Sequence, residues 1–421
     1  MTAKRTSGRI AYLLKKFPRL SETFVLNEIL GQEQLGRDIV IFSRREADDE
    51  PRHPELERLR APIETLPSRR EIDPWQTLFL SDWEAPEELF MRVGKLVRSA
   101  RTWGHPRFAS LLVEALYLLS RTREVDVQHV HAHFATDSAM VAMLLHELGG
   151  PGYSITAHAK DIYRSTVDDE LLSRMFSNAE FVVTVCDANV EALGARLSEP
   201  AMAKLRRLYN GIDLSSYVPT FEGREENHVL AIGRLVEKKG FDVLLDALRL
   251  MADEGISFRA SIVGQGDQEQ LLRQRIVDLA LTDRVELLGP RDQDEVRSIM
   301  RRATLFCLPC IIGADGNRDA LPTVLLEALA SGLPCISTPV TGIPEILGEG
   351  QVGDLVPEND PARTAQAMTA LLQNKQRRLD LARAGRHHAE QLFDRDKIAQ
   401  VLSGWFDEAL KPKSAPCESF H

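Results

Sequence analysis

The 421-residue sequence has few cysteines and no long apolar segment. Five cysteines in a chain of this length do not make a disulfide framework, so the sequence indicates a reducing, cytoplasmic compartment. No stretch reaches the ~18 to 20 consecutive apolar residues that a membrane-spanning helix needs. The first basic residues, Lys4, Arg5 and Arg9, precede only a short apolar run at residues 10–14, so no signal peptide is expected.

The sequence also lacks an excess of basic charge, because 62 acidic residues outnumber 52 lysines and arginines and the formal net charge is −10. Binding to the phosphates of nucleic acid favours a basic surface, so the sequence predicts no nucleic-acid partner. Hydrophobic residues make up 43% and charged residues 27% of the chain, which is typical of a globular protein rather than a disordered one. A chain of 421 residues exceeds one ordinary core, so we expect two domains.

Short apolar runs typical of strands alternate with segments typical of helices, which predicts parallel sheets covered by helices. In the first half, strands are expected at residues 10–14, 39–42, 127–130, 153–156 and 181–185. The pattern restarts after a polar stretch at 219–227, with strands expected at 229–232, 259–263, 285–288, 304–308 and 335–337. We therefore predict two α/β domains, residues 1–218 and 219–397, with a C-terminal helix at about 398–421 packing back onto the first.

A basic amphipathic segment lies at residues 91–103, where Arg92, Lys95, Arg98 and Arg101 alternate with apolar side chains. Such a helix can lie on an anionic membrane, which would place the protein peripherally at the inner face of that membrane. It can equally pack on its own domain and keep its charged face in water. The sequence alone leaves both interpretations open.

The most informative segment is GRLVEKKG at residues 233–240, between a predicted strand and a predicted helix. A glycine such as Gly233 permits close approach of the backbone to a ligand. Arg234 and Lys239, five residues apart, can converge across the loop on one anion. Cations fixed in a cleft stabilise the charge that grows on a departing nucleoside diphosphate. Taken alone, however, this loop could equally be a solvated turn.

A second segment, residues 313–334, contains an acidic loop that ends at Pro322 and a helix that opens at about Thr323. Backbone N–H groups at a helix start suit phosphate oxygens. Glu327, one turn into the helix, offers two oxygens that can accept from a pair of ribose hydroxyls. An isolated glutamate at this position could also serve only to cap or solvate the helix.

Together, GRLVEKKG and DALPTVLLEALASGLP (319–334) resemble the donor-binding signature of the GT-B glycosyltransferases, in particular glycosyltransferase family 4. YNGID at 209–213 and TGIPE at 341–345 extend the resemblance over nearly the whole chain. It implies two Rossmann-like domains facing across a cleft, a nucleotide-sugar donor, and retention of the anomeric configuration. The family usually carries E-x7-E, and here Asp319 replaces the first glutamate.

The resemblance also implies a role for each motif residue. Arg234 and Lys239 would bind the diphosphate, Glu327 would bind the ribose, and Asp319 would face the donor sugar. Of these, Arg234, Lys239 and Asp319 would take part directly in catalysis. The other expected donor contacts are Gly233, Gly264, Leu321, Pro322 and Thr323.

Three histidines, His129, His131 and His133, alternate at the end of a predicted strand, where α/β sheets place their ligand sites. They would share one strand face and could suggest zinc, but no carboxylate or cysteine of suitable spacing completes the set, so no metal is expected. By resemblance, a histidine here contacts the transferred sugar; His133 is the best match for this catalytic role and His131 the second. TAHAKD at 156–161 resembles the next strand end, so His158 and Asp161 are expected to line the same cleft.

The first loop, KKFPRLSET at 15–23, lacks the Gly-Gly pair that many relatives have here. A phosphate contact is therefore expected from Ser21 or Thr23 at a helix N-terminus, or from Lys16 and Arg19. Ser21 is the expected N-cap, with Glu22 in the first turn. The phrase LSETFVLNEI at 20–29 resembles members associated with bacterial exopolysaccharide and surface-glycan assembly.

Three other patterns are interpreted as structural. GQG at 264–266 lacks a third glycine at dinucleotide spacing, so NAD binding is not expected. Asp292 and Asp294 form a DxD that precedes a helix, so N-capping is expected rather than metal binding. Cys307 and Cys310 form a CxxC pair in an apolar run without a second ligand pair, so we expect buried thiols.

The sequence therefore predicts a hexosyltransferase that works without a metal or other cofactor. It would transfer a hexose from a nucleotide-sugar donor to a hydroxyl of a sugar, glycan or lipid-linked acceptor. A UDP-sugar is the favoured donor and GDP-mannose the second. Two alternatives are a GT-B-fold nucleotide-sugar epimerase and a non-catalytic glycan-assembly protein that keeps a relic donor pocket.

Overall fold

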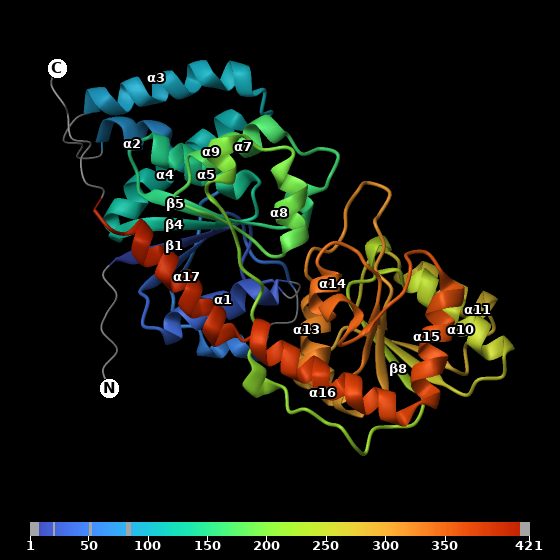
Figure 1. Ribbon diagram of the computed structural model, residues 1–421. Helices are drawn as coiled ribbons and strands as arrows, with labels where there is room; N and C mark the ends of the chain where they lie inside the picture. The colour runs from blue at the N-terminus through green and yellow to red at the C-terminus, as the bar shows by residue number, and fades with distance from the viewer. Residues whose placement is uncertain (1–7, 20–21, 50–52, 81–85, 413–421) are drawn as a thin grey trace.

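The protein is described by a computed structural model over residues 8–19, 22–49, 53–80 and 86–412. Two parallel β-sheets, each covered by helices, form two units that lie side by side (Figure 1). The strand pairs of the described chain are parallel, as the alternation of apolar runs and helical segments predicted. The predicted fold class, two Rossmann-like α/β domains, is confirmed.

The first sheet has the strand order β3-β2-β1-β4-β5-β6-β7. Its strands are β1 (Arg9–Leu14), β2 (Ile39–Ser43), β3 (Ile63–Thr65), β4 (Val127–His133), β5 (Gly152–Ala157), β6 (Val182–Thr184) and β7 (Leu205–Arg207). Strand order reverses between β1 and β4, and sheets of this kind bind ligands at the carboxyl ends of the strands beside such a reversal.

The helices of the first unit are α1 (Thr23–Gln34), α2 (Pro74–Leu80), α3 (Pro86–Trp103), α4 (Phe108–Glu124), α5 (Asp137–Glu147), α6 (Ala159–Ile162), α7 (Asp169–Ser177), α8 (Asp187–Gly194) and α9 (Glu199–Met202). Helix α1 begins one residue later than predicted. Glu22 has non-helical backbone angles and occupies the N-cap position, so the predictions that Ser21 caps the helix and that Glu22 lies in its first turn are wrong. Ser21 itself lies outside the described residues.

The second sheet has the order β10-β9-β8-β11-β12-β13, which reverses between β8 and β11. Its strands are β8 (His228–Ile232), β9 (Arg259–Val263), β10 (Val285–Gly289), β11 (Leu305–Leu308), β12 (Cys335–Ser337) and β13 (Asp354–Leu355). Its helices are α10 (Phe241–Asp253), α11 (Glu269–Asp278), α12 (Gln293–Arg302), α13 (Thr323–Ala330), α14 (Ile343–Ile346), α15 (Pro361–Gln373) and α16 (Lys375–Leu392). The chain changes sheet between β7 and β8, and the boundary at residue 218 stays a prediction within that interval.

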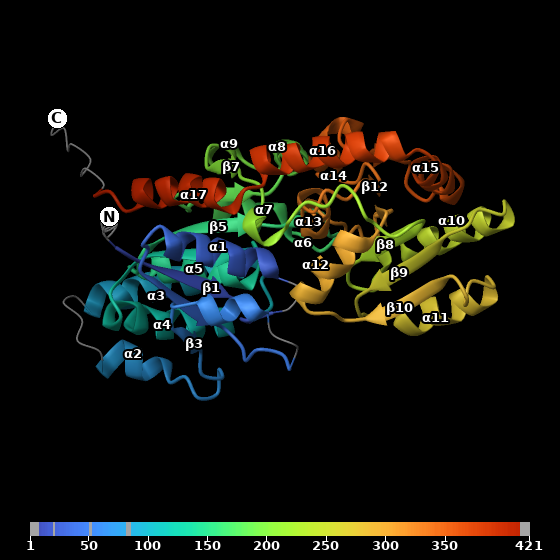
Figure 2. The same ribbon diagram turned by 90° about the horizontal axis from the view of Figure 1, so that it is seen from below.

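The last helix, α17 (Arg395–Ala409), returns to the first sheet and lies along α1 (Figure 2). Gln32 Nε2 of α1 donates to the Ala399 carbonyl of α17 at 2.8 Å. The two crossings between the units lie together, because the Ile212 N–H donates to the Phe393 carbonyl at 2.9 Å and the Arg395 N–H to the Ile212 carbonyl at 3.0 Å. The units are therefore joined by two adjacent segments of the chain.

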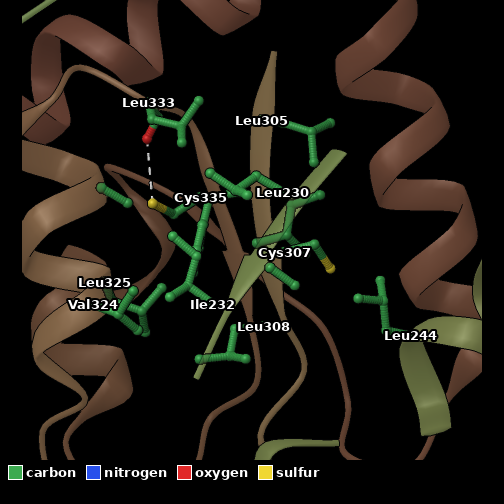
Figure 3. Packing of buried hydrophobic residues seen from close by; sticks show 14 of the residues in the cluster. Leu230, Ile232, Leu244, Leu305, Cys307, Leu308, Val324, Leu325, Leu333 and Cys335 are labelled. Atoms are coloured by element: carbon green, nitrogen blue, oxygen red, sulfur yellow. Dashed lines mark hydrogen bonds between the residues drawn. The ribbon is translucent and has the colours of Figure 1, made fainter. Parts of the chain in front are cut away.

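The cysteines of the described chain lie in the core of the protein. Cys186, Cys307, Cys310 and Cys335 are all free and buried. Figure 3 shows Cys307 and Cys335 among leucine and isoleucine side chains, with the Cys335 thiol donating to the Leu333 carbonyl at 3.2 Å. Burial raises the pKa of the Cys310 thiol to about 12. The interpretation of the CxxC pair as buried thiols is confirmed.

Candidate active site

A cavity of about 530 Å³ lies between the two units, and both contribute to its walls. It collects loops that follow strand ends of both sheets: Thr23 after β1, His158 after β5, Gly233 after β8 and Gly264 after β9. This is the position that the strand-order reversals favour for a ligand. The cavity is lined by eight arginine or lysine residues and three carboxylates, so it is basic in a chain of net charge −10.

Two glycines bring the backbone of the second unit close to this cavity. Gly240 has φ of 65°, and a Cβ there would lie 1.9 Å from the Pro309 carbonyl oxygen. Gly264 has φ of 143°, and a Cβ there would lie 1.9 Å from the Gly233 carbonyl oxygen. Only glycine fits at these positions, and together they pack the loops after β8 and β9 tightly against their neighbours.

Lys239 and Asp319 meet at the cavity wall. Lys239 Nζ lies 2.6 Å from one carboxylate oxygen of Asp319, and Lys238 Nζ lies 2.9 Å from the other. Burial alone would raise the pKa of Asp319, but the two ammonium groups hold it well below its usual range. Asp319 raises the pKa of Lys239 in turn, against the effect of burial. The predicted sugar-facing carboxylate is thus already bound by two cations, of which the sequence analysis had missed Lys238.

Arg234 has a different environment. Arg234 is exposed and lines the cavity. No hydrogen-bond or ion-pair partner is found for its guanidinium among the described residues. A guanidinium presents several donors in a planar fork that suits phosphate oxygens. Arg234 is therefore the cation of this loop that an incoming anion can bind without displacing a carboxylate.

Helix α13 presents the rest of the predicted donor residues. Pro322 occupies its N-cap position, Thr323 is its first residue, and both line the cavity with Leu321. Glu327, one turn in, is only 7% exposed and still reaches the cavity. Gln293 Nε2 donates to Glu327 Oε2 at 3.4 Å. Burial raises the pKa of Glu327 to about 7, so its carboxyl gains and loses a proton near neutral pH.

The opposite wall includes two histidines, His53 and His158, and His158 is the one that follows a strand end. It follows β5 directly and packs against the rings of Phe24 and Phe134, with centroids 4.8 and 4.5 Å away. Burial lowers the pKa of His158 well below its usual range, so the ring is a neutral imidazole. A neutral imidazole can both donate a hydrogen bond and accept one, and one ring nitrogen of His158, Nε2, already lies 3.3 Å from His133 Nδ1.

His133 does not line the cavity and is 1% exposed. Its Nε2 lies 3.1 Å from Glu28 Oε1, and its Nδ1 lies 3.3 Å from His158 Nε2. Both ring nitrogens therefore contact the protein itself, and the structure does not present them to a sugar. His131 is buried deeper still, between Ser154 and Thr156 at 2.7 and 3.0 Å. The structure therefore does not place His133 or His131, the predicted sugar contacts, at the cavity, whereas it does place His158 there.

Two family models match this chain: "Glycosyltransferase Family 4" over residues 21–216 and "Glycosyl transferases group 1" over residues 219–388. Between them they cover both units and both walls of the cavity. The chain belongs to glycosyltransferase family 4.

Curated relatives of this glycosyltransferase extend over most of its length. The colanic acid biosynthesis glycosyltransferase WcaL of Escherichia coli is 26% identical over 391 residues, 87% of this chain and 91% of the relative. The amylovoran biosynthesis glycosyltransferase AmsK of Erwinia amylovora is 28% identical over 381 residues, 86% of this chain and 89% of the relative. A phosphatidyl-myo-inositol mannosyltransferase of Mycobacterium leprae is 35% identical over 190 residues, 44% of this chain and 46% of the relative.

Solved structures share the fold of this glycosyltransferase. HepE of Anabaena, in complex with UDP and glucose, has a TM-score of 0.72 and 15% identity, with 95% of this chain and 100% of that chain covered. A sucrose-phosphate synthase of Thermosynechococcus elongatus has a TM-score of 0.73 and 17% identity, with 95% and 98% covered. At these identities the likeness shows the two-domain GT-B fold.

Asp161 of the glycosyltransferase was predicted to line the cleft, but it lies beneath the cavity wall and is 2% exposed. Its Oδ2 accepts from the backbone N–H groups of Ala135 at 2.9 Å and His158 at 3.0 Å. Asp161 therefore ties the end of β5 to the turn after β4. The two backbone N–H groups satisfy this buried carboxyl, and the contact with the His158 N–H holds His158 in place.

The first unit of the glycosyltransferase also contributes cations to the cavity, among them Lys160, which the sequence analysis had not selected. Lys160 lines the cavity, and its Nζ lies 3.6 Å from the centre of the Phe134 ring. Arg19 also lines the cavity, where its Nη1 contacts Glu22 at 2.7 Å. Lys16, the other predicted phosphate contact, is instead paired with Asp48. The position of Lys160 two residues after His158 at a strand end is the sequence signal that could have pointed to it.

The structure also revises the reasoning about metals in the glycosyltransferase. Glu28 of α1, His131 and His133 bring one ligand atom each to within 4.8 Å of one another. The carboxylate that the sequence analysis missed is thus supplied by a helix distant in sequence. These atoms are engaged in hydrogen bonds, since Tyr12 Oη donates to Glu28 Oε1 at 3.0 Å and His133 contacts the same oxygen. The DxD at 292–294 behaves as predicted: Asp292 caps α12, accepting from the Glu295 N–H at 2.8 Å.

Proposed function

We propose that this glycosyltransferase transfers a hexose from a nucleoside diphosphate to a hydroxyl of a glycan or lipid-linked acceptor, with retention of the anomeric configuration. One observation carries the proposal: a single cavity joins the cations Arg234 and Lys239 and the carboxylate Glu327 to His158 from the other unit. The relatives named for colanic acid and amylovoran biosynthesis support a role in assembling a bacterial surface polysaccharide.

In this mechanism Arg234 and Lys239 bind the diphosphate, and Glu327 binds the ribose. The bond between the anomeric carbon and the phosphate oxygen breaks while a bond to the acceptor oxygen forms. The nucleoside diphosphate leaves with the electron pair, and the proton of the acceptor hydroxyl is released. Fixed cations stabilise the charge that develops on the leaving phosphate, while His158 positions the sugar across the cavity. Asp319, neutralised by two lysines, orders the cation pair.

The donor nucleotide is identified by thermal unfolding of the protein with UDP, GDP and ADP. UDP is the first to test, because HepE of the same fold is solved with it, and GDP is the second. A ligand at 100 times its dissociation constant adds about 2.7 kcal/mol to the free energy of unfolding. Incubation with the matching nucleotide sugar and no acceptor should give slow hydrolysis. Epimerised nucleotide sugar in that reaction would instead favour an epimerase and contradict the proposal.

We further propose that sugar transfer needs no divalent cation, since protein cations already face the leaving group. Turnover should be unchanged in EDTA. Loss of turnover in EDTA with recovery on adding manganese or magnesium would contradict this proposal. Recovery with zinc alone would direct attention to Glu28, His131 and His133, the group of ligand atoms within 4.8 Å.

The raised pKa of Glu327 predicts a pH-dependent nucleoside affinity. The pKa is about 7, so the carboxylate that accepts from ribose hydroxyls is mostly ionised at pH 8 and mostly protonated at pH 6. If only the ionised form binds well, the dissociation constant should rise about tenfold over that interval. Titration calorimetry with uridine or guanosine measures this without interference from phosphate ionisation. Glu327→Gln should bind more weakly with a flat profile, and an equally steep profile in that variant would contradict the assignment.

A further inference from the structure

The first unit exposes a cluster of aromatic side chains far from the cavity. Trp75 and Phe79 of α2 are 63% and 61% exposed, and Phe90 and Met91 of α3 are 40% and 66% exposed. Trp75 and Phe79 stack with ring centroids 5.7 Å apart, and Phe79 lies 5.2 Å from Phe90. Single exposed apolar residues are common on proteins, but a contiguous group marks an interaction surface.

Packing of the two helices does not account for this exposure. Leu78 of α2 and Leu89 and Leu96 of α3 are buried in the core of the first unit, so each helix is already anchored by another face. The aromatic side chains point away from those anchors. In a chain with only 6% aromatic residues, three rings in contact at the surface indicate a binding face.

Charge selects the partner. Helix α3 begins with the exposed acidic residues Glu87 and Glu88, but from Leu89 to its end it contains Arg92, Lys95, Arg98 and Arg101 and no acidic residue, although the chain as a whole has a net charge of −10. Lys95 and Arg98 are exposed, and neither has an ion-pair partner among the described residues. Aromatic rings beside basic side chains match an anionic bilayer surface, which takes the rings into its interfacial region and the cations onto its headgroups.

We propose that the face formed by Trp75, Phe79, Phe90, Met91, Lys95 and Arg98, the α2–α3 face, docks peripherally on an anionic lipid bilayer. None of the helices in the described part of the chain is long and apolar enough to span a membrane, so insertion would be shallow. Figures 1 and 2 show α3 on the side of the first unit remote from the second unit. Docking there leaves the second unit and the donor wall of the cavity away from the lipid. The proposal does not depend on which donor the enzyme uses.

Vesicle flotation with the full chain tests this. The protein should float with phosphatidylcholine vesicles containing about 30 mol% phosphatidylglycerol and much less with phosphatidylcholine alone. Trp75→Ser/Phe79→Ser and Lys95→Gln/Arg98→Gln should each lower the partition coefficient at least about tenfold, and salt at about 0.5 M should also weaken binding. All variants should keep the wild-type thermal shift with UDP or GDP, which shows that they are folded.

Leu271→Ser/Val277→Ser is the matched control, because these α11 side chains of the other unit are 60% and 58% exposed. It should float as the wild type does. Absence of wild-type binding to anionic vesicles, or equal binding by the aromatic variant, would overturn the proposal. A concentration-dependent dimer that Trp75→Ser/Phe79→Ser abolishes, without vesicle binding, would show that this face joins two copies of the chain instead.

Discussion

Arg234→Ala is expected to lower kcat by about 100- to 1000-fold while leaving the melting temperature near that of the wild type. Arg234 is exposed at the cavity and has no partner among the described residues, so its removal leaves no buried charge behind. A preorganised donor facing a developing anion contributes about 3 to 4 kcal/mol to the transition state. Steady-state kinetics and thermal unfolding on the same preparation measure both quantities.

Lys239→Ala is expected to have a similar effect on kcat. Its partner Asp319 keeps the contact with Lys238 at 2.9 Å, so the buried carboxylate is not left unpaired. Arg273→Ala is the matched control: Arg273 lies on α11, outside the cavity, and pairs with Glu269. It should keep wild-type kcat and stability. Near-normal turnover in both Arg234→Ala and Lys239→Ala would remove the leaving-group role from this loop.

The donor wall could be predicted from the sequence because its determinants are local. Arg234 and Lys239 lie within eight residues of the end of β8, and Glu327 lies one turn into a helix that Pro322 opens. A strand end, a glycine and a helix start can each be recognised from a short sequence pattern. A parallel sheet then brings such strand ends to one edge. No contact between residues distant in sequence was needed to predict this wall.

The opposite wall depends on contacts that a local pattern does not contain. His133 and His158 both end strands, and the sequence offered no reason to prefer the second. The preference comes from Glu28 of α1 and Tyr12 of β1, which meet at the edge of His133 and enclose it. The same helix supplies the carboxylate beside His131. Packing between elements more than 100 residues apart decides which histidine reaches the cavity.

The sequence did not show which face of the predicted helix at 91–103 is buried, for a related reason. A helical pattern at 91–103 was visible, but its two interpretations, packing or membrane contact, differ only in which face the core covers. The structure shows that Leu89 and Leu96 are buried while Phe90 and Met91 are exposed, so one helix packs on the domain and also presents apolar side chains to solvent. Contact between Phe90 and Phe79 of α2 then creates a surface that neither helix has alone.

His158→Ala is expected to lower kcat about 100-fold without changing the affinity for UDP or GDP. The proposed diphosphate and ribose contacts Arg234, Lys239 and Glu327 lie on the second unit, whereas His158 reaches the cavity from the first, where we expect it to contact the sugar. Loss of one positioned hydrogen-bonding group at a reacting centre has an effect of this size. Measuring kcat, nucleotide affinity and melting temperature on one variant separates this role from a structural one. His387→Ala, an exposed histidine of α16, is the control and should behave as the wild type.

Two further variants test whether Glu28 and His133 affect transfer only through their contact with His158. Glu28 contacts His133, and His133 contacts His158 at 3.3 Å, so both act on the sugar through that last ring and are positioning residues. Glu28→Gln keeps the shape of its side chain and should lower kcat less than His158→Ala does, with nucleotide affinity unchanged. His133→Ala removes a buried ring, so it should lower the melting temperature as well as kcat. A His158→Ala enzyme with normal kcat beside a stable but inactive His133→Ala enzyme would return the sugar contact to His133.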